Sequence, residues 1–232
     1  MTDTLKILLN EKSFAVCVKP GNICSEDDGT EKCMPFLLAE SLGIDRKSIY
    51  TVHRLDREVG GVMVYAKNEV CAKKLSALVS ERKMIKEYAA VVHGRPAEDS
   101  DTLTDLLFRD SQKNKSFVVD KMRKGVKEAS LEYTLLGSKT DSEYGKISLV
   151  KIRLHTGRTH QIRVQFSSRN MPLVGDSRYG GGKDGCVIAL FSQRLAFEHP
   201  FAKGKTVDIS YSPDASLEPW SEFKMCADTA SL

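Results

Sequence analysis

A cluster of charged side chains, His53-Arg54-Leu55-Asp56, stands shortly before the apolar run Gly61–Ala66. This pattern places the cluster at the entrance to a strand that we predict to be buried. A carboxylate such as that of Asp56 can form or stabilise a covalent species at a sugar or base carbon. On spacing alone, Asp56 and Arg54 fit a surface salt bridge equally well.

A second dense cluster runs from His155 to Arg163 and reads His-Thr-Gly-Arg-Thr-His-Gln-Ile-Arg. It could supply the guanidinium that keeps a carboxylate in a cleft ionised. His155 and His160 are five residues apart and do not share a helical face, so we predict no metal site here. Thr159, His160 and Gln161 either cap the following helix or contact phosphate.

The elements that must position these clusters follow from the hydrophobic pattern. Apolar or alternating runs predict strands at residues 14–18, 61–66, 85–92, 129–136, 147–154, 187–190 and 207–211. Helical spacing predicts helices near 32–42, after a cap at Asn68, and over 158–168, with Arg82 and Lys83 in the last turn of the second helix. The lysine-rich segment 109–127 would be an exposed hairpin or loop, and the glycines between 175 and 185 mark a flexible loop.

Composition indicates a globular protein. The chain has 232 residues, 41% hydrophobic and 28% charged, which can fill one sizeable core or two small lobes around a shared sheet. No apolar run approaches the ~20 residues needed to cross a bilayer, and no signal segment is evident, so we expect a soluble, cytoplasmic protein with no membrane partner. The cysteines form no Cys-x-x-Cys pair, which predicts reduced, mostly buried thiols: Cys17, Cys24, Cys33, Cys71, Cys186 and Cys226.

Basic residues are concentrated in two segments. Residues 109–127 carry seven basic and two acidic side chains, a net charge of +5, and residues 151–169 carry five basic and no acidic side chains, again +5. Since the whole chain has a net charge of +4, the remainder carries −6. Such a positive side suits a phosphate backbone, although two solvated surface faces would give the same pattern.

Several motifs occur in a fixed order along the chain. They are His53–Asp56, Lys86-Glu87-Tyr88, Gly157–Arg163, and Pro172–Asp176 with Tyr179-Gly180. Together they closely resemble the RluA-type pseudouridine synthases. Lys19-Pro20-Gly21 and His199-Pro200 match an early and a late element of that family, so the resemblance runs from about Phe14 to Tyr211.

The resemblance implies an α+β fold with a mixed, largely antiparallel central sheet, flanking helices and a central catalytic cleft. It also implies an isomerase that breaks the N-glycosidic bond of a uridine in ribosomal or transfer RNA, rotates the uracil and rejoins it through carbon 5. No metal or organic cofactor is implied, and we expect a monomer. Residues 1–232 would form one catalytic domain, with no room for the small N-terminal RNA-binding module of the S4 kind that many relatives carry.

The resemblance also implies roles for individual residues. Asp56 would be the nucleophile, attacking the ribose or the base or first abstracting a proton, and Arg163 would pair with it. Tyr88 would be a further catalytic residue that stacks on the flipped uracil and is a candidate to handle a proton, although an aromatic on an alternating strand is more often part of a core. Arg54 would enter the RNA stack where the uridine has left.

The remaining substrate-binding residues would be His53, Arg158, Thr159, His160 and Gln161. For His53, a structural hydrogen bond is a stronger interpretation than a role in shuttling protons.

Two departures from the family pattern stand out. Val59-Gly60-Gly61 replaces a Thr-Ser-Gly segment, with the loss of two hydroxyls, and Leu190-Phe191-Ser192 replaces Leu-His-Ala. They motivate a rival hypothesis, an RNA-binding relative that has lost catalysis. A third hypothesis is a carboxylate-based glycosidase that uses Asp56 and Glu58, although nothing in the chain indicates a carbohydrate groove.

Overall fold

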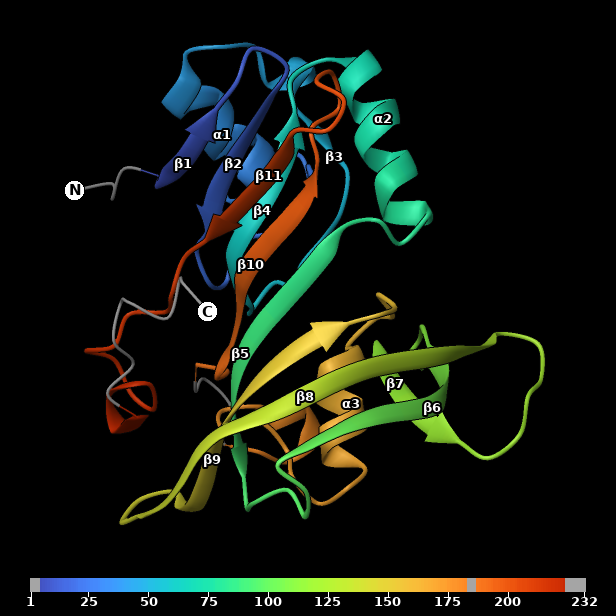
Figure 1. Ribbon diagram of the computed structural model, residues 1–232, viewed down its shortest axis with the longest axis vertical. Helices are drawn as coiled ribbons and strands as arrows, with labels where there is room; N and C mark the ends of the chain where they lie inside the picture. The colour runs from blue at the N-terminus through green and yellow to red at the C-terminus, as the bar shows by residue number, and fades with distance from the viewer. Residues whose placement is uncertain (1–4, 183–186, 224–232) are drawn as a thin grey trace. The chain divides into compact units, whose positions relative to one another are not determined.

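The structure is a computed structural model that describes residues 5–182 and 187–223 (Figure 1). The chain forms two compact units. The first comprises Met1–Lys86 and Ser192–Ser212, and the second comprises Glu87–Phe191 and Pro213–Leu232. The boundaries fall within two strands, β5 (Ile85–His93) and β10 (Leu190–Glu198), so each of these strands has residues in both units.

The first unit contains a sheet in the order β1-β2-β4-β10, with β11 paired to β10 and β3 paired to β4. Its strands are β1 (Ile7–Asn10), β2 (Phe14–Lys19), β3 (Tyr50–Thr51), β4 (Gly60–Ala66), most of β10, and β11 (Thr206–Ser210). Strand β2 runs antiparallel to β4 in a register that pairs Phe14 with Ala66 and Lys19 with Gly61. This pairing brings the end of β2 beside the start of β4, and the loop that carries the first charged cluster leads into β4 at this point.

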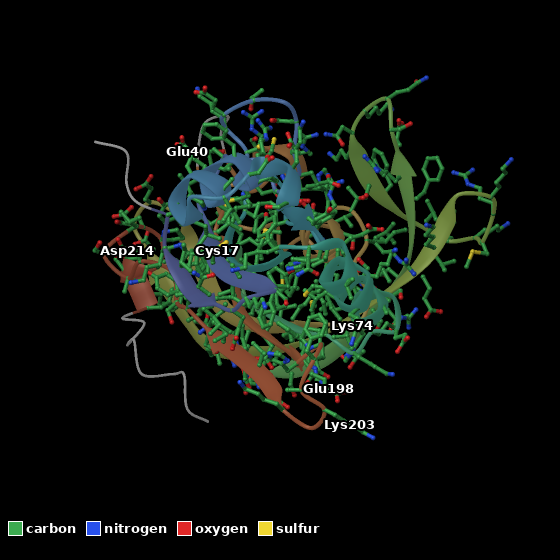
Figure 2. The ribbon with its side chains drawn as sticks, turned by 90° about the horizontal axis from the view of Figure 1, so that it is seen from above. Cys17, Glu40, Lys74, Glu198, Lys203 and Asp214 are labelled. Carbon is green, nitrogen blue, oxygen red and sulfur yellow. The ribbon has the colours of Figure 1, made fainter. Side chains whose placement is uncertain are left out.

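Two helices belong to the first unit. Helix α1 (Met34–Leu42) has Pro35 in its first turn and ends at Gly43, which adopts a left-handed conformation that glycine tolerates well. Helix α2 (Glu69–Ser80) begins at Asn68, whose side chain accepts a hydrogen bond from the backbone N–H of Cys71 at 2.9 Å. Lys74 on α2 donates to the carbonyl of Pro200 and lies 4.6 Å from the ring centre of Phe201, just beyond Glu198 at the end of β10 (Figure 2).

The second unit contains an antiparallel sheet in the order β5-β9-β8-β6-β7. The further strands are β6 (Ser100–Asp110), β7 (Lys115–Val119), β8 (Val126–Asp141) and β9 (Gly145–Leu154). Its helix is α3 (Gln161–Ser167), and short 3₁₀ turns occur at Ser177–Tyr179 and Ser221–Phe223. A corresponding turn in the first unit spans Arg46–Ser48.

Each unit has buried apolar clusters of its own. In the first unit, Phe14, Val62 and Val64 on the sheet pack with Leu75 of α2. In the second unit, one cluster surrounds Trp220, and a separate small cluster joins Leu107, Ala129, Val164 and Tyr179. Among the described residues no helix is both long and apolar enough to cross a bilayer.

The structure confirms the α+β class and the largely antiparallel sheet. Cys17, Cys33 and Cys71 are buried, as predicted, and Cys24 is partly exposed. Cys186 and Cys226 lie outside the described residues. The division into two compact units does not decide whether they form one domain, so the single-domain assignment stays a prediction.

Several predicted boundaries are wrong for identifiable reasons. Helix α2 ends at Ser80, so Arg82 and Lys83 lie outside it; Arg82 adopts a positive φ of 57°, which cannot continue a helix. Helix α3 begins at Gln161 rather than at 158, because His160 has a φ of 55°.

Other errors concern the strands. The strand predicted at 187–190 instead begins at Leu190 and continues to Glu198 through polar residues that interrupt its apolar pattern. The sequence pattern does not predict strand β6, because most of its first half is polar and exposed. The exposed segment 109–127 does contain a hairpin, formed by β6 and β7.

Candidate functional site

Asp56 lies in the loop between β3 and β4, and the residues on both sides of it are anchored. The hydroxyl of Ser25 donates to the carbonyl of Leu55 at 2.9 Å and accepts from the N–H of Leu55 at 3.1 Å. On the other side, the ammonium of Lys19 donates to the carbonyl of Arg57 at 2.9 Å. The backbone that carries the Asp56 carboxylate is therefore fixed from two directions by the segment 19–25.

Lys19 is fully buried, which is rare for a lysine. Its ammonium also donates to the carbonyls of Pro20 at 2.9 Å and Ile23 at 2.7 Å, so its three donors face three backbone acceptors. Burial lowers the pKa of Lys19 to about 8, although the negative groups nearby, among them the carboxylates of Asp56 and Glu58, act in the opposite direction.

His53 is part of the first unit's framework. Its Nε2 accepts a hydrogen bond from the backbone N–H of Val64 at 3.1 Å in the buried strand β4. Burial, with a smaller contribution from the Lys86 ammonium, holds the pKa of His53 well below its usual range. A neutral imidazole that accepts at Nε2 carries its proton on Nδ1. This arrangement matches the structural hydrogen bond that we preferred to a proton shuttle.

Arg54 points away from the core of the first unit. Its side chain is two thirds exposed, and its guanidinium forms an ion pair with Glu26 at 2.6 Å. Because both partners are exposed, this pair contributes little to stability. The side chain of Arg54 can therefore leave Glu26 at small cost, and its contact with RNA stays a prediction.

The second unit holds a buried ion pair between Arg163 on α3 and Asp176. The guanidinium donates from Nε and Nη2 to the two carboxylate oxygens, each at 2.8 Å. Arg163 is 3% exposed and Asp176 is 1% exposed. Such a fork-like pair sets the orientation of the guanidinium as well as its charge. In the sequence, Asp176 stands out only as part of a motif.

A tight backbone turn presents Asp176 to Arg163. The N–H of Gly175 donates to the carbonyl of Gly181, and the N–H of Gly181 donates to the carbonyl of Asp176, both at 2.8 Å. A Cβ at Gly181 would lie 1.7 Å from the carbonyl oxygen of Leu173, so only glycine fits. The described part of the glycine-rich segment, which we predicted to be a flexible loop, is thus closed by hydrogen bonds.

Gln161 holds together the loop that precedes α3. Its Oε1 accepts from the Thr156 hydroxyl at 2.7 Å and from the N–H of Arg158 at 3.0 Å, and its Nε2 donates to the carbonyl of Ser130 at 3.1 Å. Nε of Arg158 donates to the carbonyl of Glu128. In this structure the amide of Gln161 is used for positioning, and the binding role predicted for it stays a prediction.

The other predicted site residues of the second unit lie on different elements. The side chain of Tyr88 is buried on β5, opposite Ile152 of β9. Thr159 and His160 precede α3 and contact β7 and the Ser177–Tyr179 turn. The structure therefore brings Arg163 together with Asp176, while the pairing of Arg163 with Asp56 and the cleft around them stay predictions.

The segments of the two departures touch in the first unit through Gly61, a glycine that the family segment shares, and Ser192. A Cβ at Gly61 would lie 2.4 Å from the backbone of Ser192, and the Ser192 hydroxyl donates to the carbonyl of Val62 at 3.1 Å. Val59 is 2% exposed, so its apolar side chain belongs to the core.

Two positioning residues of the site are hard to find from the sequence. Lys19 stands out only because Lys19-Pro20-Gly21 resembles an early element of the family, and Ser25 carries no signal at all. Among the described residues no group of three or more His, Cys, Asp or Glu side chains could hold a metal ion.

Comparison with known proteins places these features in context. Residues 13–168 match the family model described as RNA pseudouridylate synthase. An uncharacterized RNA pseudouridine synthase of Aquifex aeolicus is 43% identical over 138 residues, which are 60% of this chain and 41% of that protein. The ribosomal large subunit pseudouridine synthase D of Borreliella burgdorferi is 36% identical over 150 residues, 63% of this chain and 44% of that protein. The chain thus covers less than half of either relative.

The fold has a counterpart among solved structures. Human RNA Pseudouridylate Synthase Domain Containing 1 aligns with a TM-score of 0.76 and 22% identity, over 95% of this chain and 87% of that one. At this level of identity the likeness concerns the fold.

Proposed function

Because this chain belongs to the RNA pseudouridylate synthase family, we propose that it isomerises a uridine in structured RNA to pseudouridine, with Asp56 as the catalytic nucleophile. The observation that carries the proposal is the family match over residues 13–168, which includes both charged clusters. The anchoring of the backbone on both sides of Asp56 supports it, because a nucleophile must be held in a productive geometry. Ribosomal RNA is a candidate substrate, since one relative is named for the large ribosomal subunit.

The proposed reaction is an internal transfer that consumes no co-reactant. The bond between uracil N1 and ribose C1′ breaks, the base rotates, and C5 bonds to C1′. The hydrogen on C5 leaves as a proton, and N1 gains one. Asp56 stabilises or attacks the carbon left electron-poor by the first bond cleavage.

Release of the C5 hydrogen gives a direct test. The protein would be incubated with cellular RNA labelled with tritium at uridine C5, from cells that lack this protein. We expect tritium to appear in the water together with pseudouridine in the RNA. Binding of RNA without any release would support the non-catalytic relative instead.

The basic hairpin of β6 and β7, with the turn into β8, is the proposed RNA-contacting surface of the second unit. Lys121, Arg123 and Lys124 in that turn are exposed, and the Arg123 guanidinium lies 5.1 Å from the Phe108 ring centre. We expect Lys121→Ala with Lys124→Ala to weaken RNA binding. The slope of log K against log salt should also fall, by roughly one for each phosphate that the variant no longer neutralises.

Titrating RNA binding at several salt concentrations measures this slope. Lys203→Ala is the matched control, because this exposed lysine lies in the turn between β10 and β11 of the first unit (Figure 2). Equal slopes for the hairpin variant and the wild type would mean that the hairpin does not touch RNA.

The lowered pKa of Lys19 leads us to expect a loss of activity at alkaline pH. Below about pH 8 it has three donors for its three carbonyls, whereas the neutral amine has two. As the pH rises through about 8, one carbonyl loses its donor and Asp56 loses a nearby positive charge, so we expect kcat to fall.

Initial rates of tritium release between about pH 6.5 and 9 test this, with melting curves at each pH to confirm that the fold is intact. Lys19→Arg stays protonated throughout, so its rate should lack this decline. A wild-type rate that is level over the same range would rule out this role for Lys19.

A further inference from the structure

The hydroxyl of Tyr179 lies where the basic hairpin meets the loop before α3. It accepts a hydrogen bond from the N–H of Ser116 on β7 at 2.8 Å, and its oxygen is 3.0 Å from Nδ1 of His160. Strand β7 is the last strand in the order of this sheet, so its outward N–H groups need partners from elsewhere. Tyr179 provides one and connects it to His160.

Ser116 makes a second connection between the same two segments. Its hydroxyl donates to the carbonyl of Thr159 at 2.7 Å, and the residue is 2% exposed. His160 follows directly, with a φ of 55° that is uncommon for a residue other than glycine. Such a conformation persists only where the surroundings fix it. Ser116 holds the carbonyl of the Thr159–His160 peptide, and Tyr179 holds the imidazole of His160.

The Tyr179 ring makes contacts that match those of its hydroxyl. The guanidinium of Arg163 lies 5.4 Å from the ring centre, and the ammonium of Lys115 on β7 lies 4.9 Å from it. The ring therefore attracts one cation from α3 and one from the hairpin. The N–H of Tyr179 also points to the carboxylate of Asp176 at 3.3 Å, the partner of Arg163.

The packing around Tyr179 joins the same elements. Its ring belongs to a small buried cluster with Leu107 of β6, Ala129 of β8 and Val164 of α3, and Val118 of β7 packs against this cluster. A second tie runs along the edge: Lys115 donates to the carbonyl of Arg178 at 2.6 Å. Tyr179 thus contacts three features. Its hydroxyl bonds to the hairpin and to the loop before α3, and its ring and backbone N–H contact the two partners of the buried ion pair.

We propose that Tyr179 is a positioning residue that holds the basic hairpin in a fixed place relative to Arg158–Arg163, so that RNA bound by the hairpin is presented to that segment in one register. This inference rests on the proposed function. It assigns to Tyr179 a role in the rate of reaction rather than in RNA affinity. Tyr179 is buried, and the side chains that we propose to bind phosphate are the exposed ones of the hairpin.

Tyr179→Phe tests the inference because it removes the hydroxyl and keeps the ring with its two cations. We expect kcat for tritium release to fall about 10- to 100-fold while KM changes by less than about threefold. We also expect faster hydrogen exchange at residues 115–119 and 158–161, where the hydroxyl's bonds are removed. Ser116→Ala removes only the bond to the Thr159 carbonyl and should lower kcat less.

Tyr133→Phe is the matched control. Tyr133 is also buried in the second unit, and its hydroxyl donates to the carbonyl of Glu98, away from the hairpin turn. It should leave kcat and the exchange of both segments unchanged. An active wild type with an equally active Tyr179→Phe variant would overturn this inference and leave the proposed function intact.

A wild type that releases no tritium would refute the proposed function instead. Hydrogen exchange then tests whether Tyr179 holds the hairpin against the segment Arg158–Arg163. Unchanged exchange in Tyr179→Phe would overturn this coupling. Should Tyr179→Phe fail to fold, the same two measurements on Ser116→Ala decide, and wild-type values there would overturn the coupling.

Discussion

Asp56→Asn should abolish turnover while RNA affinity survives. The asparagine amide has nearly the shape of the carboxylate but cannot act as a nucleophile or stabilise a developing positive charge. Removal of a nucleophile commonly costs about 10⁴-fold or more in kcat. RNA affinity should persist, because we propose that the phosphate contacts come from the basic segments. Tritium release measures the first quantity, and titration of labelled RNA measures the second.

Glu58→Gln is the control for that experiment. It makes the same chemical change two residues further along the loop, and the isomerase should remain mostly active, whereas a glycosidase that uses Asp56 and Glu58 would be disabled. Turnover by Asp56→Asn within tenfold of wild type would refute the assignment of Asp56 as the nucleophile.

Asp176→Asn should strongly destabilise the second unit. It leaves the Arg163 guanidinium buried opposite a neutral amide, and breaking a buried ion pair in this way costs roughly 3–5 kcal/mol. Urea unfolding can be followed through Trp220, the single tryptophan of the chain, which lies in the core of the second unit. We expect the unfolding midpoint to move to lower urea concentration.

Asp208→Asn provides a matched comparison. Asp208 forms an equally well-aligned pair with Arg194, at 2.8 and 2.7 Å, but it is nearly half exposed. An exposed pair contributes about 0.2–1 kcal/mol, so this change should have little effect on the first unit, which is followed by circular dichroism because Trp220 lies in the second unit. Equal losses of stability in the two variants would show that the Arg163–Asp176 pair does not have the energetic role that its burial indicates.

The elements whose pattern is strongly apolar could be predicted well from the sequence. Strands β2, β4, β5 and β9 and the cap at Asn68 lie where their periodicity placed them. Strand β6 could not be predicted, because it buries few side chains and therefore lacks an alternating signal. Helix α3 begins later than predicted because a left-handed His160 is not marked by any glycine.

The residues predicted for the site stand in recognisable motifs and their roles stay predictions, whereas the contacts that the structure shows around them could not be predicted. The arginine at position 163 stands in a recognisable motif, but its pairing with Asp176 depends on a turn that no local pattern announces. Likewise, Lys19 reaches Arg57 across 38 residues of chain and Ser25 reaches Leu55 across 30, and their hydrogen bonds end on backbone groups. Contacts to backbone leave no compositional trace.

The close approach of Gly61 to Ser192 has a further consequence. Strands β4 and β10 approach closely here because Gly61 has no side chain. The hydroxyl of Ser192 on β10 donates to the carbonyl of Val62 on β4. Ser192, one of the differences from the family motifs, therefore lies against a glycine that the motif shares. A side chain larger than hydrogen at position 61 would require the backbone of β10 to shift, so the start of β4, just after the loop that holds Asp56, depends on a residue more than 130 positions away in the sequence.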